Sequence, residues 1–259
     1  MNTLDFGFGG LEAEFWRLVF VMTRIGAAML AAPFFGAGNV PMQLRVIATA
    51  AIAVMVCGWT PLAMPADLLS AQGMVAIAGE LLIGLSLGFV LQVCFAAPTI
   101  AAEVIGGTMG MSMATTVDPN SGSHSPALGQ YFAVVLTLVF FGVGGHLQWI
   151  ALLVESYRVF PPGQTWLGAG RMAEIAGFAG MMFATAVAIA LPVTLILLLV
   201  QVVTGVLSRS APALNLFALG LPAGVLAGLA ALIASAPLVS DQMLDLSNSA
   251  ITASRSLLQ

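Results

Sequence analysis

The sequence contains no lysine and few charges of any kind. Of its 259 residues, 7% are charged, all seven basic residues are arginine, and the formal net charge at pH 7 is −4. An ordinary soluble domain has about 25% charged residues. Charges this sparse and scattered form neither a surface for nucleic acid nor an acidic or basic tail. The sequence therefore argues against nucleic-acid binding. It also indicates that much of the chain's surface does not face water.

Cysteine and histidine are equally rare, with two residues of each. Cys57 and Cys94 lie inside apolar runs without metal-ligand spacing, so we expect both to be small buried hydrophobic residues. The patterns HExxH, GxSxG and GxxxxGK[ST] are missing, and no pair of aspartates is placed as intramembrane proteolysis requires. We therefore expect no metal, no cofactor and no enzymatic activity.

Long apolar runs are what the sequence has in abundance, since 60% of its residues are hydrophobic. A helix needs about 20 apolar residues to cross a bilayer, and this length is available several times. The fold class predicted is therefore all-α, a polytopic membrane protein of about six hydrophobic segments. The six apolar blocks are Phe15–Phe35, Val46–Met64, Met74–Ala102, Ala127–Val154, Ala173–Leu207 and Leu214–Val239.

We expect a single domain over residues 1–259. Within it, the pattern indicates an N-terminal segment at 1–14, a plug-like loop at 103–126 and a polar C-terminal tail at 240–259. The fifth apolar block is too long for one perpendicular helix and has Pro192 midway. Because proline removes a backbone donor and clashes with the preceding turn, we predict a kink or a helical hairpin there.

The loop from Glu103 to Pro126 is the least regular part of the chain. It reads EVIGGTMGMSMATTVDPNSGSHSP, and its glycine, serine, threonine and proline break any long helix. Met109, Met111 and Met113 alternate with small residues, which makes the segment soft and moderately apolar. This composition suits a flexible plug or seal, and it suits equally a plain connecting loop whose methionines rest on the membrane interface.

Arg24, Glu80 and His146 are ionisable residues inside apolar blocks. A charge at bilayer depth costs roughly 2.5 to 3.5 kcal/mol on insertion scales. Arg24 therefore needs a partner, for which Glu80 and Glu103 are candidates, or it reaches the membrane interface with its long side chain. A lone histidine such as His146 is more often a packed, hydrogen-bonded residue than a proton carrier.

Glycines recur at the spacing typical of helix packing. One stripe contains Gly84 and Gly88, and another contains Gly220, Gly224 and Gly228. A one-sided glycine stripe lets two helix backbones approach closely. The neighbouring helix can belong to this chain or to another subunit.

Four segments of the sequence are distinctive when taken together with their order. They are RIGAAMLAAPFFGAGNVPMQLR from Arg24, ELLIGLSLGF from Glu80, DPNSGSHSPALGQ from Asp118 and RSAPALNLFALGLP from Arg209. Together, in order and spacing, they resemble the FliR family of flagellar export-gate proteins and its injectisome relatives, over about residues 15–239. The positions that carry the family motif and the packing are Pro33, Pro41, Gly84, Gly88, Asp118, Pro119, Arg209, Pro212, Asn215 and Gly220.

The resemblance implies a non-enzymatic component of the flagellar type III export gate in the bacterial inner membrane, at the flagellar basal body. It implies a channel formed with FliP and FliQ and associated with FlhB, through which unfolded flagellar proteins pass during flagellum assembly. It also implies helical hairpins that coil into a tapered hetero-oligomer raised out of the bilayer plane.

In this family the loop matching residues 103–126 acts as a plug. We therefore expect Met109, Gly110, Met111 and Met113 to help seal the pore. Independently of the resemblance, the cost of a buried charge leads us to expect that Arg24 makes a buried ionic contact with Glu80 or Glu103. The alternative function is a stand-alone secondary transporter or ion channel.

Overall fold

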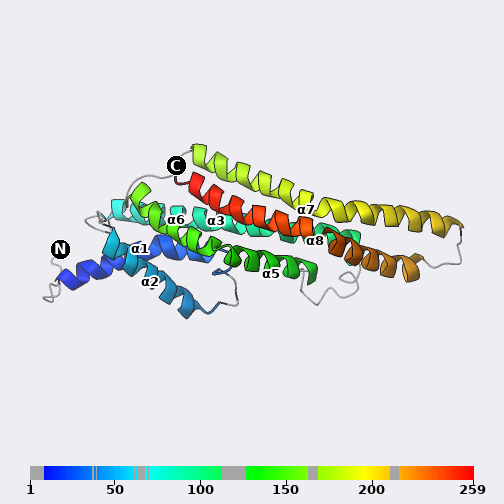
Figure 1. Cartoon of the computed structure of the whole chain (residues 1–259). Coiled ribbons are helices and arrows are strands. Elements are labelled where there is room, and N and C mark those ends of the chain that lie inside the picture. The colour runs from blue at the N-terminus through cyan, green and yellow to red at the C-terminus, as the bar shows by residue number, and fades with distance from the viewer. Residues whose placement is uncertain are drawn as a thin grey trace. The chain divides into compact units, whose positions relative to one another are not determined.

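The computed structural model describes residues 9–36, 38, 40–60, 62, 68, 70–111, 127–162, 169–210 and 216–259. These residues form seven helices and no strand (Figure 1). The helices are α1 (Gly9–Ala31), α2 (Met42–Trp59), α3 (Ala71–Thr108), α5 (Ala127–Gly142), α6 (Gly145–Val159), α7 (Ala169–Ser210) and α8 (Leu216–Ser256). The predicted all-α class is confirmed.

Four of the described helices are long and apolar enough to cross a membrane. The stretches are Met42–Trp59, Ala71–Thr108, Ala173–Ser210 and Pro222–Ser256. Helices α5 and α6 pass the same test together, which gives up to five spans. In hydrocarbon a helix satisfies its own backbone hydrogen bonds, which explains why these apolar segments form helices. The first predicted block, in α1, is not among the four.

The structure has no hairpin at Pro192 and has a break that was not expected. Helix α7 continues through Pro192, so of the predicted kink or hairpin the hairpin is wrong, and the kink stays a prediction. The fourth predicted block is instead two helices, because Gly144 has a φ of 72° between α5 and α6. A left-handed residue cannot continue a right-handed helix, and glycine adopts this conformation without steric cost.

The helices also extend into three segments that lie outside the predicted apolar blocks. Helix α1 begins at Gly9, within the predicted N-terminal segment. Helix α3 continues to Thr108, so the first residues of the predicted loop at 103–126 are helical. Helix α8 continues to Ser256 and contains most of the predicted polar tail.

The expected single domain contains two compact units. The first comprises Met1–Gln92, Gly144–Phe178 and Ala250–Gln259, and the second comprises Val93–Val143 and Ala179–Ser249. Helices α3, α7 and α8 each contribute residues to both units.

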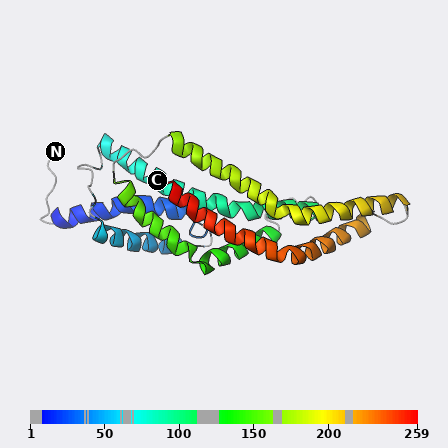
Figure 2. The same ribbon diagram turned by 45° about the horizontal axis from the view of Figure 1, so that its top comes forward.

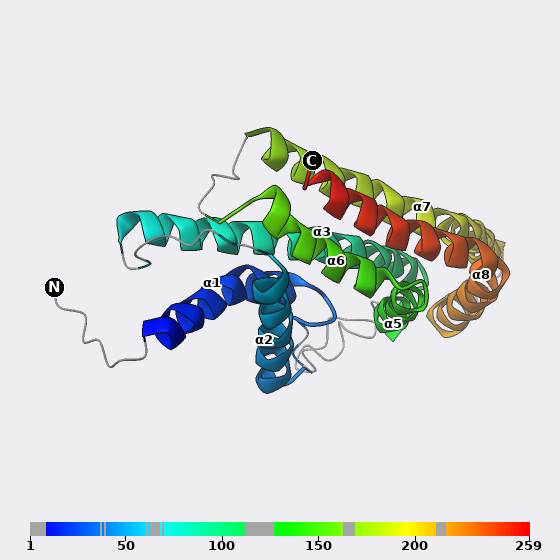
Figure 3. The same cartoon turned by 60° about the vertical axis from the view of Figure 1, so that its left-hand side comes forward.

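In the first unit, α1 packs beside α2, as Figure 3 shows. Nη2 of Arg17 donates hydrogen bonds to the carbonyl oxygens of Cys57 and Thr60 at 3.0 and 3.1 Å. The last carbonyls of a helix have no partner within the helix, and a cation is favourable there. Arg17 thus joins α1 to the C-terminal end of α2.

In the second unit, α7 and α8 form an antiparallel pair, which Figure 2 shows best. The rings of Phe95 on α3 and Phe140 on α5 pack edge to face with centroids 5.6 Å apart. Cys94 is buried and its Sγ donates to the Leu246 carbonyl on α8 at 3.1 Å, whereas Cys57 of the first unit is half-buried. Burial is therefore confirmed for Cys94.

Candidate functional site

Arg24 on α1 and Glu80 on α3 form a buried ion pair in the first unit. Nε of Arg24 donates to Oε2 of Glu80 at 2.7 Å, and Nη2 donates to Oε1 at 2.8 Å. The two residues are 0% and 2% exposed. Two parallel bonds between a guanidinium and a carboxylate are a strong and specific geometry. The structure therefore brings together two of the three predicted ionic residues, within one chain.

Helix α6 supplies the other partners of Arg24. Nη1 donates to Oγ of Ser156 at 3.0 Å, and Nη2 donates to the Phe160 carbonyl at 2.9 Å. The guanidinium carbon lies 4.1 Å from the centroid of the Tyr157 ring, and the Tyr157 hydroxyl donates to the Val21 carbonyl at 2.7 Å. Buried charges are tolerated when they are paired and hydrogen-bonded. The network thus joins α1, α3 and α6.

Sequence reasoning missed Ser156 and Tyr157. They lie in the polar sequence ESYR just after the fourth apolar block, and Ser156 is 132 residues from Arg24 along the chain. Glu103, the other predicted partner, belongs to the second unit and its side chain is exposed. It takes no part in the Arg24–Glu80 ion pair.

Gly84 and Gly88 let α3 lie directly against α1. A Cβ atom at Gly84 would overlap the Arg24 carbonyl oxygen, and one at Gly88 would lie 2.5 Å from the Ala28 carbonyl oxygen. Backbone atoms cannot move aside as a flexible side chain can. The first glycine stripe therefore packs within this chain, next to the ion pair.

The connection between α1 and α2 contains both motif prolines of the first of the four distinctive segments. Pro33 lies half-buried in the turn after α1, and Pro41 is the exposed N-cap residue of α2. Proline is tolerated at a helix start because the amide it lacks has no partner there. Gly36 was not predicted as important, yet a Cβ atom there would overlap the Leu30 carbonyl oxygen.

In the second unit, Gly110 ends α3. Its φ is 85°, its N–H donates to the Gly107 carbonyl at 3.1 Å, and the Met111 N–H donates to the Gly106 carbonyl at 3.0 Å. This pair of bonds is the Schellman arrangement, whose left-handed position favours glycine. Gly110 therefore has a structural role whatever else the segment does.

Met109 is 3% exposed and lies against α8. A Cβ atom at Gly228 would lie 2.5 to 2.8 Å from Cγ, Sδ and Cε of Met109, and one at Gly224 would lie 3.1 Å from its carbonyl oxygen. We call the surface formed by Gly224 and Gly228 the glycine notch. The preceding carbonyl, of Thr108, accepts a hydrogen bond from Nε2 of Gln201 on α7 at 2.8 Å.

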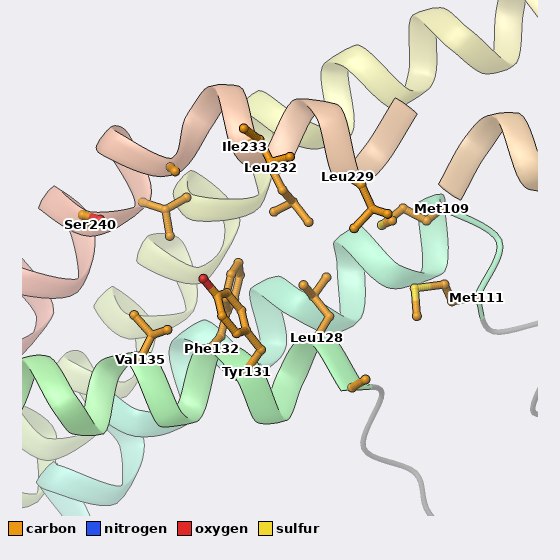
Figure 4. A pocket seen from close by; sticks show the side chains of 13 residues that line it. Met109, Met111, Leu128, Tyr131, Phe132, Val135, Leu229, Leu232, Ile233 and Ser240 are labelled. Carbon is orange, nitrogen blue, oxygen red and sulfur yellow. The ribbon is translucent and has the colours of Figure 1, made fainter. Parts of the chain in front are cut away.

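A cavity of about 510 Å³ adjoins the end of α3 within the second unit. Figure 4 shows Met109 and Met111 at one end of it and Ser240 at the other, with Tyr131 and Leu232 between them. The lining is mainly apolar and comes from α3, α5 and α8. Such a site accommodates hydrocarbon groups, not ions.

Five predicted site residues lie outside the described residues: Met113, Asp118, Pro119, Pro212 and Asn215. Arg209 is exposed in the last turn of α7, and Gly220 is half-buried near the start of α8. His146 is half-buried in the first turn of α6. Among the residues with described positions, no group of three His, Cys, Asp or Glu side chains could hold a metal ion.

Comparison with known proteins gives a consistent result. The family model described as "Bacterial export proteins, family 1" matches residues 15–250. The chain is 30% identical over 233 residues to the flagellar biosynthetic protein FliR of Escherichia coli (strain K12), which covers 89% of this chain and 86% of that protein. It is 31% identical over 211 residues to the protein of the same name from Bacillus subtilis (strain 168), with coverages of 80% and 81%.

Proposed function

Since the chain belongs to family 1 of the bacterial export proteins, we propose that it forms, with FliP and FliQ, the channel that exports unfolded flagellar proteins. The chain is a component of the flagellar export apparatus in the bacterial inner membrane. The observation that carries the proposal is the family match over residues 15–250, which spans both units. FlhB is the further partner that we propose.

The exposed side chains of the second unit support the proposal that the chain is a subunit of a hetero-oligomer. Phe183, Leu199 and Val206 of α7 are 60%, 66% and 61% exposed, so this helix needs lipid or protein around it. Asp241 and Asp245 on α8 are also exposed, within a stretch apolar enough to span a membrane. A carboxylate facing acyl chains near the bilayer centre costs roughly 2.5 to 3.5 kcal/mol, so this face suits a protein or aqueous neighbour.

We further propose that the segment after α3 plugs the closed channel. Met109, Gly110, Met111 and Met113 would contribute, with Met113 outside the described residues. Flexible thioether side chains conform to a narrow lumen and later to varied polypeptides, which suits a seal. Deleting residues 110–116 is expected to raise ion leakage across the membrane while leaving the complex assembled. Unchanged conductance in an assembled complex would contradict the plug.

The proposed channel is tested by placing a photo-cross-linking amino acid at Met111 in the complete complex. With a flagellar protein stalled in export, we expect a cross-link from position 111 to that polypeptide. The control is the same complex without a stalled polypeptide. A purified complex that contains FliP and FliQ but gives no cross-link would contradict a channel lining at this position.

The alternative, a stand-alone transporter or ion channel, relied on Arg24, Glu80 and His146 as intramembrane ionisable groups. Arg24 and Glu80 bind each other, so their charges are used to hold α1, α3 and α6 together. Purification separates the two functions. An export-gate component co-purifies with FliP and FliQ, whereas a transporter is active when reconstituted alone.

A further inference from the structure

The end of α3 is held by two neighbouring helices of the second unit. Met109 packs into the glycine notch on α8, and Gln201 on α7 donates to the Thr108 carbonyl at 2.8 Å. The last four carbonyls of an α-helix lack partners within the helix, so the bond from Gln201 satisfies one that would otherwise need water. Both contacts act on the last turn of α3, immediately before Gly110 ends the helix.

The contact with Gly228, one of the two residues of the notch, is of a kind that can be released. It involves Cγ, Sδ and Cε of Met109, which form the far end of an unbranched side chain with three rotatable bonds. At Gly224 the nearest atom is the Met109 carbonyl oxygen, which does not move with the side chain. The contact of Gly84 and Gly88 with α1 is instead between backbones. A rotamer change is enough to take the Met109 side chain out of the notch, whereas separating α3 from α1 requires whole helices to move.

Space for the released side chain lies next to the notch. Met109 itself lines the cavity of about 510 Å³, together with Leu229, which directly follows Gly228 on α8 (Figure 4). The cavity opens to the surface of the unit, since Leu229, Tyr131 and Ile233, which also line it, are 48%, 61% and 76% exposed. A side chain that leaves the notch can enter this cavity without displacing another helix.

We propose that the end of α3 is a releasable latch. Met109 in the glycine notch holds the last turn of α3 against α8 while the channel is at rest, and it moves into the adjoining cavity when a polypeptide passes. The latch rests on the proposed export function and adds a mechanism of regulation to it. Met109 then contributes to the plug by anchoring Gly110 and Met111.

The test is a Gly228→Ala variant of the chain in the assembled complex. The added methyl group occupies the position of the Met109 side-chain end, and alanine strengthens α8 as a helix. Hydrogen–deuterium exchange reports on the amides of Met109, Gly110 and Met111, which bond to Ile105, Gly107 and Gly106. We expect about threefold faster exchange of these amides, because local opening becomes easier.

The matched control is Gly205→Ala on α7, where a Cβ atom meets nothing within 4 Å. It makes the same chemical change in the same unit and should leave the exchange unchanged. Met109→Ala empties the notch without altering α8 and should also accelerate exchange, so the test stands even if Gly228→Ala prevents assembly. Unchanged exchange in both Gly228→Ala and Met109→Ala would overturn the latch.

Ion leakage across membranes that contain these complexes tests the link to gating. Gly228→Ala and Met109→Ala should each raise leakage, and the double variant should leak no more than either, because each removes the same contact. Additive leakage, or faster exchange without leakage, would overturn the latch. Failure of the proposed function is distinguishable, since it appears as the absence of polypeptide cross-links at position 111 in the unsubstituted complex.

Discussion

Two glycine stripes of this protein make two different kinds of helix contact. In the first unit, Gly84 and Gly88 place α3 against the backbone of α1, and the Arg24–Glu80 ion pair fixes the same contact. In the second unit, Gly228 receives a flexible methionine side chain beside a cavity. The same small-residue spacing therefore forms a rigid joint in one place and a releasable one in the other, and what distinguishes them is the atom opposite the glycine.

The largest expected loss of stability comes from breaking the ion pair of the rigid joint. Glu80→Leu leaves the Arg24 charge buried without its partner, which is expected to cost roughly 3 to 5 kcal/mol. The thermal stability of the purified complex measures this loss. Glu103→Leu is the control, since Glu103 is an exposed glutamate on the same helix. Equal effects of the two substitutions would mean that the pair does not stabilise the first unit.

Gly84→Ala should cause the next largest loss of stability. The new methyl group overlaps the Arg24 carbonyl, and overpacking of this kind costs about 1 to 3 kcal/mol. Gly58→Ala on α2 adds the same methyl group where nothing lies within 4 Å, and it should be neutral or slightly stabilising. Thermal unfolding of both variants checks the difference. A Gly84→Ala complex as stable as the Gly58→Ala complex would show that α1 and α3 are not closely packed.

Tyr157→Phe should have a smaller effect on the same joint. It keeps the ring beside Arg24 and removes the hydroxyl that donates to the Val21 carbonyl, at a cost of about 0.5 to 1.5 kcal/mol. Tyr131→Phe is the comparison, because that side chain is 61% exposed. If the two substitutions shift the melting temperature equally, the hydroxyl of Tyr157 contributes nothing to the network.

Gly228→Ala is expected to have the smallest effect on stability and the clearest effect on leakage. Only the end of a flexible side chain must move, so the cost should stay below about 1 kcal/mol. Thermal unfolding and conductance of the same preparation measure both quantities. A large loss of stability without leakage would place Gly228 in a rigid joint, like Gly84.

The sequence predicts the helical class, the apolar blocks and the need of Arg24 for a partner, because these follow from local composition and the cost of a buried charge. It cannot predict that Ser156 and Tyr157 complete the network, since their distance from Arg24 along the chain leaves no local signal. The break at Gly144, and the absence of a hairpin at Pro192, could not be predicted for a related reason. A glycine or proline permits an interruption, and the packing around it decides whether one occurs.

The contacts at the end of α3 could not be predicted from local composition either. The methionines at 109 and 111 were predicted to belong to a flexible plug or a plain connecting loop, and the plug stays a prediction. The structure adds that Met109 is buried against Gly228 and that Met111 is half-buried at the cavity. Composition alone indicates a soft, adaptable segment. Which of its side chains faces α8 depends on where α3 ends, and that is set by the left-handed conformation of Gly110.

The difference between the rigid contact at Gly84 and Gly88 and the releasable contact at Gly228 is tested most directly by hydrogen–deuterium exchange along α3. The exchange is measured with and without a flagellar protein stalled in the complete complex. One helix carries both joints, so each serves as the reference for the other. Amides 80–90 should stay protected in both states, and amides 109–111 should exchange faster when a polypeptide is present. Equal protection of amides 109–111 in the two states, in a complex shown to hold the polypeptide, would contradict a releasable contact at the end of α3.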